Sequence, residues 1–172
     1  FLNKKINNKS RLFNKKLGGG VILDLGCYIV SFFNLFKKKN SKFEILNSKS
    51  NFCNTGVEID CSIEMNINDE IEALGKVSFT ENLSNICKIY FDNVIITITQ
   101  PWVPTEKTYL EVDCKSSYYK KFFHQDTDIY TQQLRSVSDI FNGDASQLDI
   151  KKFVDINESL EISKVLDLWK KS

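Results

Sequence analysis

The chain has 172 residues, of which 42% are hydrophobic and 12% aromatic, a composition typical of a packed globular protein. At this length one domain buries roughly 70% of the surface of its unfolded chain, so a full core forms without disulfides or metals. The 23 Lys and Arg residues nearly balance the 22 Asp and Glu residues, giving a net charge of +1 and no overall field that attracts nucleic acid or an anionic membrane. We therefore expect a single domain over residues 1–172, with no nucleic-acid or membrane partner.

The cysteines indicate a reducing compartment. They are odd in number, widely spaced and form no C-x-x-C pair: Cys27, Cys53, Cys61, Cys87 and Cys114. No stretch approaches the roughly 20 apolar residues of a membrane span, and the first residues lack the apolar core of a signal peptide. The sequence thus predicts a soluble, cytoplasmic protein. Because it starts at Phe1 and not at methionine, we expect the natural protein to extend further toward the N-terminus.

The first half begins with an irregular, Lys- and Asn-rich segment over residues 1–16, followed by a helix. From Gly18 to Phe36 the apolar residues recur at helical period. Three lysines follow at residues 37–39, where cations suit the negative end of the helix dipole. We interpret them as a solvated helix end and not as a phosphate site.

The middle of the chain alternates between apolar and polar residues, which predicts strands with one apolar and one wet face. The pattern is clearest where Val57, Ile59 and Cys61 alternate with Glu58 and Asp60. Further strands are expected at residues 43–46, 71–80, 86–91, 94–99, 109–114 and 118–123. Short links such as Asp92-Asn93 indicate antiparallel neighbours, because a parallel crossover needs a dozen or more residues.

Two helices are expected to close the chain. The first covers residues 128–142 and ends at Gly143, and the second covers residues 158–171 with Asn157 as its N-cap. This order of elements predicts an α+β fold, a predominantly antiparallel open sheet with helices packed on one face.

The first helix carries the one stretch that has the pattern of a site. At 100° per residue, Gly20, Asp24, Tyr28 and Ser31 fall along one narrow polar face of an otherwise apolar helix. The glycines at the helix start leave room for a ligand to approach the backbone and its unpaired N–H groups, so we expect cofactor contacts at Gly19 and Gly20. The alternative is that Asp24 is an exposed carboxylate and Tyr28 a packed aromatic with its hydroxyl at the rim.

The segment GGGVILDLGCYIVS resembles the glycine-rich helix of the Gfo/Idh/MocA oxidoreductases. It is most similar to the branch with tyrosine in place of histidine, which includes glucose-fructose oxidoreductase and dimeric dihydrodiol dehydrogenase. Three later stretches, NVIITITQPWVP, DIYTQQLRSVSDIFNGD and INESLEISKVLDLWKKS, resemble the family's strand with its Pro-aromatic loop, its penultimate helix and its closing helix. The resemblance therefore covers nearly the whole chain.

The resemblance implies the C-terminal, substrate-binding domain of an NAD(P)-dependent enzyme that transfers hydride to or from a sugar or a related hydroxyl or carbonyl compound. Tyr28 would be the proton donor or acceptor and Asp24 would support the proton transfer, with Ser31 and Trp102 in contact with substrate. A phenol needs a nearby cation for this work, and the family's cation is a lysine of the N-terminal domain. For Trp102, an aromatic anchor of a rigid loop is the alternative.

The cofactor would be NAD or NADP in the full-length protein. This chain has no G-x-G-x-x-G fingerprint and no Glu-Lys-Pro motif, so the N-terminal Rossmann domain is missing. We expect the chain alone to bind no dinucleotide and to be inactive.

Other partners and roles follow from the remaining residues. The segments Lys88–Phe91 and Val94–Ile98 carry large apolar or aromatic residues on both sides, so a homodimer through the sheet face is expected. The alternative function is a non-catalytic assembly or ligand-binding module within a multidomain protein. His124 is the only histidine, so we expect no metal site. Tyr118, Tyr119 and nearby lysines could stack and contact nucleic acid, but the balanced charge disfavours this.

Overall fold

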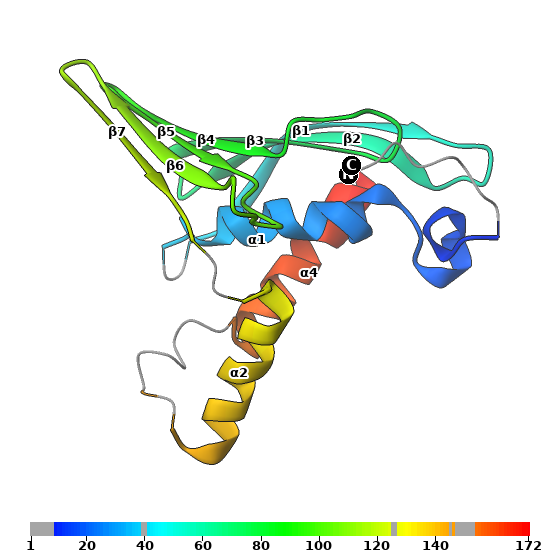
Figure 1. Ribbon diagram of the computed structural model, residues 1–172. Helices are drawn as coiled ribbons and strands as arrows, with labels where there is room; N and C mark the ends of the chain where they lie inside the picture. Colours follow the sequence, from blue (N-terminus) through cyan, green and yellow to red (C-terminus); the bar gives the residue numbers. More distant parts are fainter. Residues whose placement is uncertain (1–8, 39–40, 125–126, 145, 147–153) are drawn as a thin grey trace. The chain divides into compact units, whose positions relative to one another are not determined.

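The computed structural model describes residues 9–38, 41–124, 127–144, 146 and 154–172 (Figure 1). The chain divides into two compact units. The first contains the residues up to Leu83 together with Val154–Ser172, and the second begins at Ser84. The irregular segment predicted over residues 1–16 can be compared with the structure from residue 9 onward, because residues 1–8 lie outside the described part.

The first unit is a three-stranded antiparallel sheet covered by helices. Strands β1 (Phe43–Phe52), β2 (Glu58–Ile67) and β3 (Ile71–Ser78) lie in the order β1-β2-β3. A helix over residues 21–34, made of a π-helical turn (Ile22–Gly26) and α1 (Cys27–Asn34), packs with α4 (Ile156–Lys171) on one side of this sheet (Figure 1). Both helices and the sheet share one core, whose most buried members include Val21, Ile22, Val30, Ile63, Met65, Ile67 and Trp169.

Two glycines allow close approach: Gly26 of the first helix to α4, and Gly75 of β3 to the first helix. A Cβ on Gly26 would lie 2.8 Å from Cζ3 of Trp169, and one on Gly75 would lie 2.8 Å from Cγ2 of Ile29. Real Cβ atoms do not come this near to their neighbours, so side chains at these positions would push the layers apart. The bare backbone of the first helix is therefore in contact with the indole of α4.

The stretch Lys15–Asn34 has the length and the mean hydropathy, 1.5, of a membrane span, which the sequence analysis did not expect. Its apolar residues Val21, Ile22 and Val30 are at most 1% exposed and pack against α4 and β3. A buried core helix satisfies the same length and hydropathy test. Of its most apolar window of 18 residues, 39% is buried inside the molecule.

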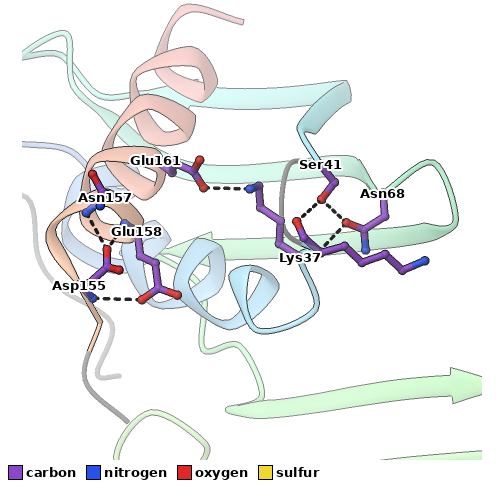
Figure 2. A network of polar contacts seen from close by, with 8 residues as sticks. Lys37, Ser41, Asn68, Asp155, Asn157, Glu158 and Glu161 are labelled. Atoms are coloured by element: carbon purple, nitrogen blue, oxygen red, sulfur yellow. Dashed lines mark hydrogen bonds and ion pairs between the residues drawn. The ribbon is translucent and has the colours of Figure 1, made fainter. Parts of the chain in front are cut away.

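Polar contacts hold the first two turns of α4 (Figure 2). At the start of α4, Asp155 accepts hydrogen bonds from the backbone N–H of Asn157 at 2.7 Å and of Glu158 at 2.9 Å, while Glu158 accepts from the N–H of Asp155 at 3.0 Å. Farther along, Glu161 pairs with Lys37 at 3.0 Å. The helix therefore begins two residues before the predicted start, and the predicted N-cap Asn157 is wrong: Asp155 caps, because its carboxylate satisfies two N–H groups at once.

The second unit contains a four-stranded antiparallel sheet and a helix. Strands β4 (Ile86–Phe91), β5 (Val94–Thr99), β6 (Tyr109–Cys114) and β7 (Ser117–Phe122) pair in chain order. Helix α2 (Ile129–Asn142) begins after the N-cap Asp128 and ends at Gly143, whose φ of 78° is the left-handed conformation typical of this position.

The predicted α+β fold with antiparallel strands is confirmed, but the strands form two hydrogen-bonded sheets where the sequence predicted one. The interruption follows Ser78, whose hydroxyl accepts the backbone N–H groups of Thr80 and Glu81. These bonds turn the backbone out of the ladder after β3. That residues 1–172 act as one domain stays a prediction.

Replacing Asp155 with Ala should lower the free energy of unfolding by about 1 kcal/mol, because two N–H groups at the start of α4 lose their acceptor. Asp155→Ser is the matched control, since a hydroxyl can still cap, and it should retain most of the stability. Urea denaturation of the three proteins measures this. Equal losses for Ala and Ser would contradict the capping account.

Candidate functional site

The predicted site helix starts in an unusual backbone conformation. Gly18 has a φ of 69° and Gly20 a φ of 122°, values that residues with side chains rarely adopt. The helix then opens with the π-helical turn Ile22–Gly26, which spans Asp24. Such turns inside helices are frequent at functional sites. The wider turn also means that a projection at 100° per residue does not hold across this stretch.

The two glycines are contacted by the chain itself. The N–H of Gly19 donates to the carbonyl of Asn14 and the N–H of Gly20 to that of Leu12, both at 2.9 Å. A Cβ on Gly19 would lie 2.6 Å from the carbonyl oxygen of Arg11. The turn Arg11–Phe13 is therefore fixed against the helix start, and the buried ring of Phe13 anchors it edge-on to Phe79.

This turn brings Arg11 to Asp24. The guanidinium Nη2 lies 3.3 Å from Oδ1 of Asp24, whose side chain is 18% exposed, while Arg11 is 65% exposed. Sequence reasoning did not find Arg11. Its only signal is the glycine run, which permits the approach of a chain segment from outside the helix.

A second charged residue, Glu58, lies on the other side of the glycines. Its carboxylate contacts Gly20, its side chain is 7% exposed, and its Oε1 is 3.5 Å from Nζ of Lys170. No hydrogen bond to this Oε1 is formed within the described residues. A carboxylate at a helix N-terminus is favoured by the helix dipole, so Glu58 stabilises the start of the site helix.

The alternating pattern predicted Glu58 on the wet face of its strand, and this is wrong. Val57 and Glu58 are both buried, because the register with β1 shifts between Asn51 and Phe52. A bulge of this kind breaks the two-residue alternation.

The remaining predicted residues fall into two groups. Tyr28 is 44% exposed and Ser31 half-buried, and their spacing of three within α1 places them on one helix face. Trp102 belongs to the second unit, in the loop between β5 and β6, where it is partly exposed. Asp24 and Tyr28 thus share the site helix with Ser31. His124 is exposed, and no group of three metal-ligating side chains occurs in the described ranges.

The space beside Gly19 and Gly20 is filled by Arg11, Leu12, Asn14 and Glu58. A cofactor that contacted these glycines would have to displace the protein atoms that already lie against them. Contact of Gly19 and Gly20 with a cofactor therefore stays a prediction, and the packing does not favour it.

Comparison with known proteins gives structural likeness only. No protein-family model matches the chain, and no curated protein matches it significantly. Among solved structures, KijD10, a 3-ketoreductase from Actinomadura kijaniata in complex with NADP and TDP-benzene, superposes with a TM-score of 0.76 at 12% identity. Aldose-aldose oxidoreductase from Caulobacter crescentus gives 0.75 at 14%, and a putative oxidoreductase from Erwinia carotovora atroseptica gives 0.61 at 13%.

The likeness covers nearly all of this chain and half of the others. The shares are 96% of this chain and 50% of KijD10, and 98% and 50% for the aldose-aldose oxidoreductase. The chain therefore spans about half the length of these enzymes. It has the Gfo/Idh/MocA-type fold that the resemblance predicted.

Proposed function

We propose that the chain is the C-terminal, substrate-side half of an NAD(P)-dependent oxidoreductase acting on a sugar or a related hydroxyl or carbonyl compound. The observation that carries this proposal is the position of Tyr28, 44% exposed on a helix whose other large apolar residues supply the core. A fold shared with sugar oxidoreductases supports it. In this function Tyr28 exchanges a proton with the substrate oxygen, and Ser31 and Trp102 contact the substrate.

The chemistry requires an acid at the reacting oxygen. Reduction of a carbonyl places negative charge on its oxygen, and a positioned phenol can donate a proton there. A lone carboxylate beside the phenol would oppose loss of that proton. Because Arg11 lies 3.3 Å from Asp24, the carboxylate's charge is balanced by a cation of the same chain. Asp24 can thus support Tyr28 by position without an uncompensated charge.

The dinucleotide would supply hydride and would be held outside this chain. NADP is bound in KijD10, but the described residues here do not fit it, because the glycines at the helix start are filled by protein atoms. The missing partner is accordingly an N-terminal Rossmann domain. This chain by itself holds no dinucleotide in the proposed arrangement.

A cytoplasmic location is part of the proposal. All five cysteines are free. Burial raises the pKa of Cys61 and of Cys87 to about 11, so both remain protonated, unreactive thiols at neutral pH.

In the longer protein that carries this chain, Tyr28→Phe should lower kcat by about 10²- to 10⁴-fold, because the substrate oxygen loses its proton donor. The assay follows reduced nicotinamide during oxidation of free aldoses and TDP-glucose with NAD⁺ or NADP⁺. Tyr130→Phe, on an exposed face of α2, is the matched control and should keep full activity. Turnover by Tyr28→Phe at the normal rate would exclude the proposed role.

Isothermal titration of the purified chain with NADP(H) and NAD(H) should show no binding, since the chain lacks a dinucleotide site. Micromolar binding would mean that the helix start at Gly19 and Gly20 holds the phosphates after all.

We further propose a homodimer through one face of the second sheet. The residues paired across β4, β5 and β6 place an uncharged face together: Cys87, Ile89, Phe91, Val94, Ile96, Ile98, Leu110, Val112 and Cys114. None of these side chains is fully buried. In a two-fold dimer the same patch of both copies meets. An uncharged patch can meet its copy without repulsion between like charges. The alternative, a non-catalytic assembly module, would use the same surface.

Ile96→Lys should convert the dimer to a monomer, because each interface would bury an unpaired charge. Thr97→Lys places the same charge on the opposite face of β5 and should leave the dimer intact. Sedimentation velocity distinguishes the two. A wild-type monomer, or equal behaviour of the two variants, would refute this interface.

A further inference from the structure

The loop that carries Trp102 begins at a residue in an uncommon backbone conformation. Gln100 has a φ of 50°. The other non-glycine residues with positive φ in the described ranges are Asn68 and Asp69, residue types that tolerate this region. Gln lacks that local advantage. A residue of this type keeps such a conformation only where its surroundings impose it, and such positions cluster at functional sites.

Hydrogen bonds join Gln100 to the residue before β4 and to the far end of its own loop. Its N–H donates to the carbonyl of Asn85 at 2.8 Å. Its side-chain Oε1 accepts from the hydroxyl of Thr105 at 2.5 Å and from that of Thr108 at 3.3 Å. One side chain at the start of the loop therefore binds two residues at its end.

Thr108, the residue before β6, forms further hydrogen bonds at the end of the loop. It is 4% exposed, its hydroxyl accepts the N–H of Thr105 at 2.8 Å, and its own N–H donates to the carbonyl of Thr105 at 2.9 Å. Its carbonyl accepts the N–H of Phe123 at 3.0 Å. The segment between Gln100 and Thr105 contains two prolines, whose φ angles are fixed. Hydrogen bonds thus join the two ends of the loop, which we call its neck, and the prolines restrict the backbone between Gln100 and Thr105.

We propose that Gln100 is the positioning residue for Trp102. Its left-handed backbone turns the chain out of β5, and its side-chain carbonyl closes the neck of the loop, so that the indole is presented in one conformation. This rests on the proposed function, in which Trp102 contacts a sugar-bearing substrate. A preorganised aromatic surface binds more tightly than a mobile one, because less conformational freedom is lost on binding.

Fluorescence quenching by acrylamide tests the ligand-free part on this chain. Trp169 is 1% exposed, so the quenchable emission reports Trp102. Gln100→Met removes the acceptor at similar size and should raise the quenching constant at least two-fold. Gln100→Glu keeps an acceptor oxygen for both threonines and should match the wild type. Gln133→Met, the same change on an exposed face of α2, is the control.

A second variant breaks the same hydrogen bond from its other partner, so the test does not depend on the folding of Gln100→Met alone. Thr105→Val removes the hydroxyl donor and leaves Gln100 in place, and it should also increase quenching. Circular dichroism at equal temperature confirms that each variant is folded.

Titration with TDP-glucose, followed by Trp102 emission, tests the ligand part. Gln100→Met should weaken binding at least five-fold, and Gln100→Glu should not. Wild-type quenching in both Gln100→Met and Thr105→Val would overturn the proposal, as would unchanged affinity of Gln100→Met despite a mobile indole. If the wild type gives no response to TDP-glucose, the substrate role of Trp102 in the proposed function fails, and the quenching series alone decides whether Gln100 fixes the loop.

Discussion

The close approach of backbone at Gly19 and Gly20 is the constraint on which the candidate site depends. Without side chains there, the turn Arg11–Phe13 bonds to the helix start and Glu58 lies against its N-terminus. The same helix is held on its other side by Trp169 against Gly26. These contacts fix the π-helical turn that carries Asp24 and the α-helical turn that carries Tyr28. Most apolar residues of this helix thus pack into or against the core, while Tyr28 is 44% exposed.

The charges around the site helix form two compensated pairs. Arg11 balances Asp24 near solvent, and Lys170 of α4 lies 3.5 Å from the buried Glu58. Glu58 in addition meets the positive end of the helix dipole, which offsets part of the cost of burying a carboxylate. Within the described residues, each of these two carboxylates thus has a cation beside it.

Much of the fold could be predicted from the sequence where a local signal is complete. Strands β4, β5 and β6 have the predicted bounds, because period-two alternation is interrupted there by Asp92-Asn93 and by the two prolines after Thr99. Helix α2 is framed by Asp128 and Gly143, as predicted. The failures arise where tertiary contacts override local pattern. A bulge buries Glu58, hydrogen bonds at Ser78 divide the strands into two sheets, and the π-helical turn changes the helical projection. The ion pair of Arg11 and Asp24 joins residues 13 positions apart, and no periodic pattern in the sequence indicates it.

The central proposal is that Tyr28, exposed on the site helix, contacts a sugar-bearing substrate. Backbone amide NMR of the isotope-labelled chain, titrated with TDP-glucose, tests it most directly. The account predicts that the largest shifts fall on Asp24, Tyr28 and Ser31 of the site helix. Shifts confined to β7, or no shifts at millimolar ligand, would contradict it.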